Sequence, residues 1–448
     1  MRIRLIAPRM SLRPMDSEFK RLMTPSISLL VLAALTPEEH QIEIQDENLA
    51  PITIDSSADL VGITCNVDMS QRGFDIARKY RELHIPVIMG GIFPSSCPEQ
   101  VLPHADSVCI GEAENVWYSI LRDAQQGTLK KVYQWKGSPE LNGVPRPKWE
   151  AIDCRKYLYT NVITTSRSCP HGCEFCYNSC EYTIKKYRRR PIPNVLAEIE
   201  KLETDQVMFV DDNFIGDTNW ALEFLKAIKP KNLTWHAAVS VDIGKKLELL
   251  DLMTATGCKS LYIGFESINA SSISSVNKKQ NSVDDYEKTI EAIHNRGIMV
   301  NASMVFGFDH DQPSVFDATL AWLVSNHIET MTAHILTPYP GTKLYQRLEA
   351  EGRIIDRNYE HYNTAHVVFQ PKLMSPEELY QGYLGMYTGF YSLHNIWNRR
   401  PKLKSEWYPF FLFNFGYRKF GKFTSRIGKL GCMNFLGQLA RRLSYGVG

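Results

Sequence analysis

Three cysteines stand at fixed spacings in the stretch TTSRSCPHGCEFCYNSC, residues 164–180. Cys169, Cys173 and Cys176 form the pattern C-x-x-x-C-x-x-C. Three thiolates on one tight loop can bind three irons of a [4Fe–4S] cube and leave the fourth iron open to a small molecule. The alternative is a zinc site, but zinc ribbons pair two distant C-x-x-C units and the sequence has one. Cys180 could supply a fourth ligand, and the six scattered cysteines are predicted to be buried thiols.

Polar residues follow the predicted strands downstream of this loop. They are Asp211, Asp212, Ser240, Asp242, Glu266 and His334. The carboxyl ends of the strands of a βα-barrel meet on one face, and that face carries the active site. For the two aspartates, the alternative is a solvated strand end. The spacing of these residues predicts one polar site next to the cysteine loop.

The elements that must position these residues are predicted from the alternation of apolar runs. Residues 1–125 alternate strand-like and helix-like segments, which predicts a doubly wound, Rossmann-like parallel sheet in a domain spanning 1–135. Ligands bind beyond the carboxyl ends of such strands. Thr64–Gly73, Gly90-Gly91 and Gly111-Glu112 fall there. Tight βα turns are the alternative reading of these glycines.

A second βα series follows a Gly- and Pro-rich stretch, 136–153, that is predicted to be a linker. About six βα units within residues 154–370 predict a partial (β/α)6 TIM-type barrel. A helical C-terminal region, 371–448, completes this α/β prediction. It ends in a basic, aromatic tail, 401–448, with nine Lys/Arg and one acidic residue. Packing on the barrel is favoured for this tail over contact with a membrane surface, and binding of nucleic acid is favoured least.

Composition excludes few functions. The chain has 448 residues and a formal net charge of +2, so global electrostatics indicate no partner. It shows no apolar run long enough for a membrane span and no apolar N-terminal segment typical of a signal peptide. We therefore expect a cytoplasmic location, where cysteines serve as metal ligands or buried thiols more often than as disulfides.

The loop CPHGCEFC, with Phe175 before its last cysteine, resembles the cluster loop of radical S-adenosylmethionine (SAM) enzymes. Four later segments, MFVDDNF, VSVDI, YIGFES and VFGFDHD, resemble family motifs in the expected order. The resemblance implies a [4Fe–4S] cluster on the three cysteines and SAM on its open iron. The implied SAM-binding residues are Phe175, Asp211, Asp212, Ser240, Asp242, Glu266 and Gly307. In the family these positions meet the amino group, the carboxylate, the ribose and the adenine.

The N-terminal segment PVIMGGIFPSSCPEQVLPHADSVCIGEAENVW is similar to the second half of the cobalamin-binding domain that one radical SAM subgroup carries. Cobalamin is therefore the third implied cofactor. The implied cobalamin-binding residues are Thr64, Asn66, Gln71, Gly90, Gly91, Gly111 and Glu112. The sequence departs from many such domains because residues 1–150 have no D-x-H-x-x-G motif. If cobalamin is held, no family-type histidine coordinates its lower face.

The resemblance implies that an electron from the reduced cluster cleaves SAM to a 5′-deoxyadenosyl radical, which abstracts a hydrogen atom from the substrate. The leading hypothesis is a cobalamin-dependent radical SAM methyltransferase acting on an unactivated carbon. One alternative is cyclisation, rearrangement or epimerisation without methyl transfer, and another is a non-catalytic iron–sulfur redox sensor. The expected partners are a small-molecule, lipid or peptide substrate and an electron donor such as flavodoxin or ferredoxin. His310, His334 and Tyr339 lie where a substrate pocket could open.

Overall fold

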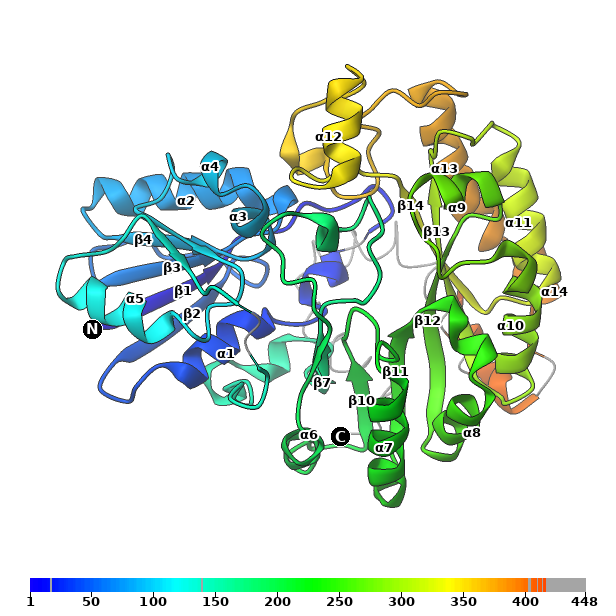
Figure 1. Cartoon of the computed structure of the whole chain (residues 1–448), viewed down its shortest axis with the longest axis horizontal. Coiled ribbons are helices and arrows are strands. Elements are labelled where there is room, and N and C mark those ends of the chain that lie inside the picture. The colour runs from blue at the N-terminus through cyan, green and yellow to red at the C-terminus, as the bar shows by residue number, and fades with distance from the viewer. Residues whose placement is uncertain (17, 138–139, 402–403, 409, 413, 416–448) are drawn as a thin grey trace.

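The computed structural model describes residues 1–16, 18–137, 140–401, 404–408, 410–412 and 414–415. Its N-terminal half contains a six-stranded parallel sheet in the order β2-β1-β3-β4-β5-β6 (Figure 1). The strands are β1 (Arg2–Ala7), β2 (Gln41–Asp46), β3 (Leu60–Thr64), β4 (Val87–Gly90), β5 (Ser107–Ile110) and β6 (Val132–Gln134). β3 and β5 are almost wholly buried, as expected for parallel strands covered on both faces.

Helices cover both faces of this sheet. They are α1 (Ile27–Leu35), α2 (Ser70–Glu82), α3 (Ile92–Ser96), α4 (Pro98–Val101) and α5 (Trp117–Gln125). One core cluster joins α2, α3 and α4 to one face, and a second joins α1 and α5 to the other. The predicted doubly wound domain is therefore confirmed.

The second half contains another six-stranded parallel sheet, in the order β7-β10-β11-β12-β13-β14. Its strands are β7 (Val162–Ile163), β10 (Gln206–Phe209), β11 (Thr234–Val239), β12 (Cys258–Glu266), β13 (Met299–Phe306) and β14 (Thr330–Ile335). The crossover helices are α6 (Ile192–Ile199), α7 (Thr218–Ile228), α8 (Leu247–Ala255), α9 (Ala270–Ser275), α10 (Tyr286–His294) and α11 (Val315–Ser325). Six parallel strands with helices between them confirm the predicted partial barrel.

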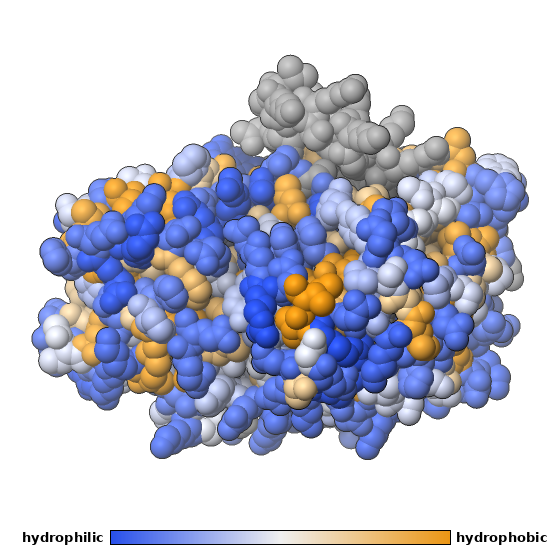
Figure 2. All heavy atoms as spheres, turned by 90° about the horizontal axis from the view of Figure 1, so that it is seen from above, coloured by the Kyte–Doolittle hydropathy of each residue, from blue (hydrophilic) through white to orange (hydrophobic). Residues whose placement is uncertain are grey.

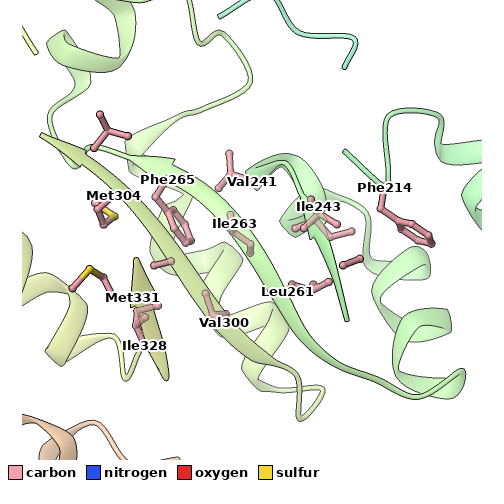
Figure 3. Close-up of a cluster of buried hydrophobic side chains, with 14 of the residues drawn as sticks. Phe214, Val241, Ile243, Leu261, Ile263, Phe265, Val300, Met304, Ile328 and Met331 are labelled. Carbon is pink, nitrogen blue, oxygen red and sulfur yellow. The ribbon is translucent and has the colours of Figure 1, made fainter. Parts of the chain in front are cut away.

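The two faces of the second sheet differ in polarity. Alternate residues of β11 and β14 are buried, and the buried set joins the largest core cluster together with the crossover helices. Figure 3 shows part of this cluster, with Leu261 and Ile263 of β12 and Met331 of β14. The residues between them face the barrel interior and stay partly accessible; they include His236, Tyr262 and His334. Because side chains alternate across a strand, the helices cover the apolar face and the interior is left polar.

The first strand of the second sheet is shorter than predicted. The apolar run of NVITTSRSC, residues 161–169, begins the second βα series, but the chain leaves the sheet after β7 and forms β8 (Ser166–Arg167). This strand pairs antiparallel with β9 (Arg188–Arg189). The reason lies in Asp211, whose carboxylate accepts hydrogen bonds from the backbone N–H groups of Thr165 and Ser166 at 2.7 and 2.6 Å. Those groups are therefore not available to continue the β7 ladder.

The carboxyl ends of the two sheets are joined to each other. Glu112, after β5, forms ion pairs with Arg188 at 2.9 Å and with Arg167 at 2.9 Å. Gly341, after β14, has a φ of +86°, and a Cβ there would lie 2.8 Å from the carbonyl oxygen of Ser96 in α3. Ion pairs and close backbone packing therefore hold the two edges together.

The C-terminal region contributes α12 (Lys343–Ala350), α13 (Pro376–Phe390) and α14 (Leu393–Asn398). Ser375 starts α13 with a capping box to Glu378. Tyr387 of α13 donates a hydrogen bond to the carbonyl of Ala333 in β14 at 3.0 Å, which fixes the helix on the sheet. The stretch predicted as a linker also packs, since Trp149 joins a small core cluster with Val162.

Much of the basic tail, whose role was left open, lies outside the described residues. Within the part of the chain that the structure describes, the helices are all too short or too polar to cross a membrane. The face seen from above is mostly hydrophilic, with apolar side chains in separate patches (Figure 2).

Candidate active site

The cysteine loop follows β8 and is tied to other elements by its backbone. The N–H of Glu174 donates to the carbonyl of Val276 at 3.1 Å, and the Asn277 side chain donates to the carbonyl of Gly172 at 3.2 Å. The Gln280 amide donates to Cys173 Sγ at 3.6 Å. The segment after α9 therefore fixes the shape of the loop.

The structure brings the three predicted cluster cysteines together and separates Cys180 from them. Burial, together with the neighbouring thiols of Cys173 and Cys169, raises the pKa of Cys176 to about 12. The pKa of Cys180 is also raised by burial, but the thiol beside it is Cys97 of the N-terminal half. Buried thiols that share one loop become thiolates readily only beside a metal.

This arrangement of thiols fits an iron–sulfur cube with three protein ligands. Among the described residues, no three His, Cys, Asp or Glu side chains are placed to hold a single metal ion. Cys169, Cys173 and Cys176 stay the predicted ligands of the cluster.

The two aspartates after β10 have different surroundings. Asp211 is buried, and its second oxygen accepts a hydrogen bond from the Thr165 hydroxyl at 2.8 Å, in addition to the two backbone bonds described above. Burial raises its pKa to about 6. Asp212 is exposed and accepts a hydrogen bond from the Tyr177 hydroxyl at 2.9 Å. Asp211 thus shapes the start of the cysteine loop, Asp212 is accessible beside it, and the contact of both with SAM stays a prediction.

Ser240 and Asp242 lie together after β11. The Ser240 hydroxyl donates a hydrogen bond to the Asp242 carboxylate. It accepts a second hydrogen bond from the Asn213 side-chain amide at 3.1 Å. Lys246 pairs with Asp242 at 2.8 Å, which lowers the pKa of that carboxyl below its usual value although burial opposes the shift. Burial lowers the pKa of His171 in the cysteine loop, and the nearby charge of Asp242 opposes this shift. Both predicted residues therefore border the loop.

Glu266 ends β12 in a left-handed conformation, with a φ of +65°. Its carboxylate forms a buried ion pair with Lys278, and each side chain is 9% accessible. The Lys278 ammonium also lies 5.8 Å from the centre of the Phe175 ring, which is typical of a cation–π contact. Phe175 itself meets Phe308 edge to face, with ring centres 6.4 Å apart. Glu266 and Phe175, predicted separately, are thus linked by one lysine.

Gly307 follows β13 with a φ of +102°. Its N–H and that of Phe308 both donate to the Asp311 carboxylate at 3.0 Å. A Cβ at Gly307 would lie 2.8 Å from the Leu379 side chain of α13. The glycine is therefore required for packing against α13 as well as for the turn.

The predicted cobalamin-binding residues lie along the carboxyl edge of the N-terminal sheet. Thr64 ends β3 and Asn66 follows it, and β3 neighbours β1 at the point where the strand order reverses. Gly91 has a φ of +106°, and a Cβ there would lie 2.9 Å from the Cys65 carbonyl oxygen. Gly111 has a φ of +78° with open space beside it. A flat ligand could approach this edge closely because glycines line it.

Two residues of the predicted cobalamin set stand apart from the rest. Gln71 lies on α2 and is exposed. Glu112 pairs with Arg188 and Arg167, and these cations hold its pKa below the usual value although burial opposes the shift. Glu112 therefore links the two sheets, and its contact with cobalamin stays a prediction.

Sequence reasoning did not single out Lys278, Asn213, Gln280 or Arg188. Lys278 is 12 positions beyond Glu266 in a stretch without apolar periodicity. A search for a cation to compensate the buried Glu266 could have found it. The other three act through contacts between distant segments, for which the sequence carries no local signal.

Comparison with known families agrees with this geometry. Residues 163–323 match the model of the radical SAM superfamily. Residues 23–121 match the B12 binding domain. This chain is a radical SAM protein with a B12-binding domain. Residues 342–414 also match a domain of unknown function, DUF4070. The predicted subgroup is therefore confirmed.

Relatives of this radical SAM protein include bacteriochlorophyllide d C-12(1)-methyltransferase of Chlorobaculum tepidum. The two are 28% identical over 407 residues, covering 88% of this chain and 89% of the relative. Anaerobic magnesium-protoporphyrin IX monomethyl ester cyclase of Rubrivivax gelatinosus is 24% identical over 370 residues, covering 74% and 66% of the two chains. Both relatives are enzymes.

The fold is shared with the radical SAM methyltransferase TsrM from Kitasatospora setae, solved with cobalamin and a [4Fe–4S] cluster. The TM-score is 0.63 at 17% identity, over 86% of this chain and 88% of that one. The predicted fold class and the predicted radical SAM enzyme are confirmed. The roles of individual residues stay predictions.

Proposed function

We propose that this radical SAM protein is a cobalamin-dependent methyltransferase that acts on an unactivated carbon of a small-molecule substrate. One observation carries the proposal: residues 181–185, directly after the cysteine loop, line one pocket together with Gly111 and Glu112 of the N-terminal edge. Tyr339 packs against the N-terminal core cluster, and its pKa is raised by burial and by the charges of Asp68 and Cys176. A cluster and a corrin placed at these edges would have the substrate between them.

We assign the chain's residues to SAM as follows. Asp212, exposed beside the cysteines, suits the ammonium of SAM, and Glu266 suits two ribose hydroxyls as a bidentate acceptor. Lys278 and Lys246 offer cations for the carboxylate, with Ser240 and Asp242 beside them. Phe175 and Gly307 would border the adenine.

The cofactors supply the radical and methyl-transfer chemistry, while the protein supplies position, dryness and electrostatics. The buried Asp211 fixes the backbone that begins the cysteine loop, and Gly91 lets the N-terminal edge pack closely. Ion pairs of Glu112 with Arg167 and Arg188 close the junction of the two edges against water. The reducing electron would come from a donor such as flavodoxin or ferredoxin.

A second reaction class, a radical reaction without methyl transfer, is favoured by the cyclase relative described above. The mass of the product separates the two classes. We expect anaerobically reconstituted protein, given SAM, cobalamin and a reductant, to convert its substrate to a product heavier by one methylene unit. A product lighter or equal in mass would instead support the cyclase-type reaction.

The same assay is run with SAM that carries a deuterated methyl group. Transfer of the label to the product supports the proposal, and SAM cleavage without label transfer contradicts it. Retention of cobalamin after desalting, measured by absorbance on the same samples, tests the N-terminal half separately.

A further inference from the structure

Exposed apolar side chains gather on the last elements that the structure describes. Five large apolar residues are exposed there, and we call them the Trp397 face: Leu393, Trp397, Tyr408, Leu412 and Phe415. The other exposed large apolar residues of the described chain are spread over residues 83–373. A single exposed apolar residue is ordinary in a folded protein, whereas a group of them on one side is typical of an interaction surface.

The residues of the Trp397 face lie side by side on two helical segments. Leu393 and Trp397 are one turn apart on α14, so they share one side of that helix. The second segment, 407–415, is helical in its described residues, and its exposed residues follow one another at the spacing of one helix face. The Trp397 ring lies 6.2 Å from the Phe411 ring, centre to centre, and Phe411 stacks on Phe415 at 5.4 Å. The face is therefore one continuous surface.

The opposite side of the second segment packs on the barrel. Phe410 and Asn414 are buried, and the Asn414 amide donates a hydrogen bond to the Glu329 carbonyl at 3.1 Å. Arg399, also buried, donates to the Ile328 carbonyl at 2.9 Å. Both carbonyls directly precede β14, the strand at the other end of the sheet from β7 (Figure 1). These bonds fix the segment on the barrel and turn the Trp397 face outward.

Positive charges border the Trp397 face. The Arg400 guanidinium lies over the Trp397 ring, 4.4 Å from its centre. Lys404, just before the second segment, is exposed. In the sequence, residues 393–448 are rich in lysine and arginine and contain one acidic residue, Glu406. An apolar surface with a positive border matches a partner that offers both apolar groups and negative charge.

We propose that the Trp397 face binds the surface of a membrane that contains anionic lipids. The inference goes beyond the proposed function and does not depend on it. Tryptophan and tyrosine favour the boundary between water and acyl chains, because their rings are apolar and each carries one polar group. The leucines and Phe415 would enter the outer part of the apolar layer. Arg400, Lys404 and the basic residues that follow in the sequence would attract the anionic headgroups.

Two other partners fit the face less well. In a symmetric dimer the face would meet its own copy, and the cations of the two copies would repel each other. Single-stranded nucleic acids are bound by bases that stack on free aromatic rings. Arg400 already lies over the Trp397 ring. Phe415 is stacked on Phe411, and the two leucines of the face offer a base no ring. A membrane surface is therefore the partner that the face favours.

Flotation with lipid vesicles tests the proposal. Anaerobically reconstituted protein is mixed with vesicles of phosphatidylcholine and phosphatidylglycerol in equal parts, and the lipid concentration at which half of the protein floats measures the affinity. We expect binding that Tyr408→Ser weakens about tenfold, because an apolar side chain is lost from the contact. Tyr118→Ser on α5 is the matched control, since Tyr118 is 62% and Tyr408 66% accessible, and should leave the affinity unchanged.

The charge at the border of the face has its own pair of variants. Lys404→Gln should weaken binding to the same vesicles about fivefold, because one cation near the headgroups is lost. Lys79→Gln, at an exposed position on α2, should bind as the wild type does. With vesicles of phosphatidylcholine alone, wild type and Lys404→Gln should bind equally weakly.

Lipids with brominated acyl chains give a local readout. Bromine quenches tryptophan fluorescence only at close range, so these vesicles should quench the fluorescence that comes from Trp397. Trp397→Phe keeps an aromatic ring beside Phe411 and should remove much of this quenching. Trp135→Phe, at an exposed position after β6, should retain it.

Three results would overturn the proposal. The first is absence of flotation with the anionic vesicles, or equal flotation of wild type and Tyr408→Ser. The second is a dimer that forms without vesicles and that Tyr408→Ser dissociates in sedimentation velocity, which would assign the face to a second copy of the chain. The third is binding of a single-stranded oligonucleotide, without flotation, that Tyr408→Ser abolishes. These measurements need neither SAM cleavage nor methyl transfer, so their outcome is independent of the proposed function.

Discussion

Side chains from a distant segment add to the backbone bonds that hold the cysteine loop, whereas backbone hydrogen bonds join the turns at the carboxyl edge of the N-terminal sheet. Asn277 and Gln280 bind the loop from the segment after α9. At the N-terminal edge, the Cys65 N–H donates to the Gly90 carbonyl at 2.9 Å and the Phe93 N–H donates to the Cys65 carbonyl at 3.2 Å. An edge that backbone hydrogen bonds hold offers a smooth surface, which suits a large flat ligand. A loop that side-chain hydrogen bonds also hold can fix the positions of three sulfur atoms.

The largest effect that would separate the two regions comes from replacing Cys169, Cys173 and Cys176 together by Ala. Without thiolates the loop has no iron ligands, so we expect complete loss of iron and of SAM cleavage, with cobalamin binding retained. Iron and sulfide analysis of anaerobically reconstituted protein checks this. Cys180→Ser is the matched control and should keep about four irons per chain, since three ligands suffice. Loss of the cluster in that control would contradict the three-ligand assignment.

Lys278→Met tests the side chains that surround the proposed SAM site. It leaves Glu266 buried without its partner, which should lower the free energy of unfolding by about 3–5 kcal/mol. Urea unfolding measures the change, and equilibrium dialysis measures the accompanying loss of SAM binding. The neighbouring Lys279 is exposed, so Lys279→Met should behave as the wild type. Equal behaviour of the two variants would exclude an important role for the buried pair.

Gly91→Ala tests the backbone-built edge. A positive φ is strained by about 1–2 kcal/mol in a residue with a side chain. The new Cβ would in addition press on the Cys65 backbone. We expect loss of cobalamin retention with the iron content unchanged. Gly127→Ala has a similar strain, with a φ of +68°, but open space around its Cβ, and should retain cobalamin. Retention by both variants would argue against a ligand at this edge.

His334, between the two regions, gives the smallest effect. Its pKa is about 3 in the fold, below the ordinary 6.5, so the unfolded chain binds the proton more readily. The contribution of neutral His334 to stability is present above pH 6.5 and decreases as the pH falls. Between pH 6.5 and 5, wild type should lose about 2 kcal/mol relative to His334→Gln. Denaturant unfolding at the two pH values checks this, and His310→Gln, at an exposed position, should show no such difference.

The sequence predicted those features that depend on local patterns. Alternating apolar runs indicated both sheets, and the spacing of the cysteines indicated the cluster loop. The sequence could not predict that the Asp211 carboxylate accepts hydrogen bonds from the N–H groups of Thr165 and Ser166. Hydrogen bonds between segments 45 positions apart leave no periodic pattern in a sequence. For the same reason, no local pattern indicates that Glu112 pairs with Arg167 and Arg188.

The segment between β1 and α1 enters the barrel, where Met15 packs against the large core cluster, and this has a consequence for biosynthesis. Ser11 accepts a hydrogen bond from Asn363, 352 positions later in the chain, and also bonds Asp68. Contacts between such distant segments form late, because closing a long loop is entropically unfavourable. Ser11 therefore waits for a partner that is synthesised 352 positions later. The mouth of the barrel is completed only after both sheets have folded and Asn363 has been added, so the cysteine loop stays open to iron–sulfur delivery until then.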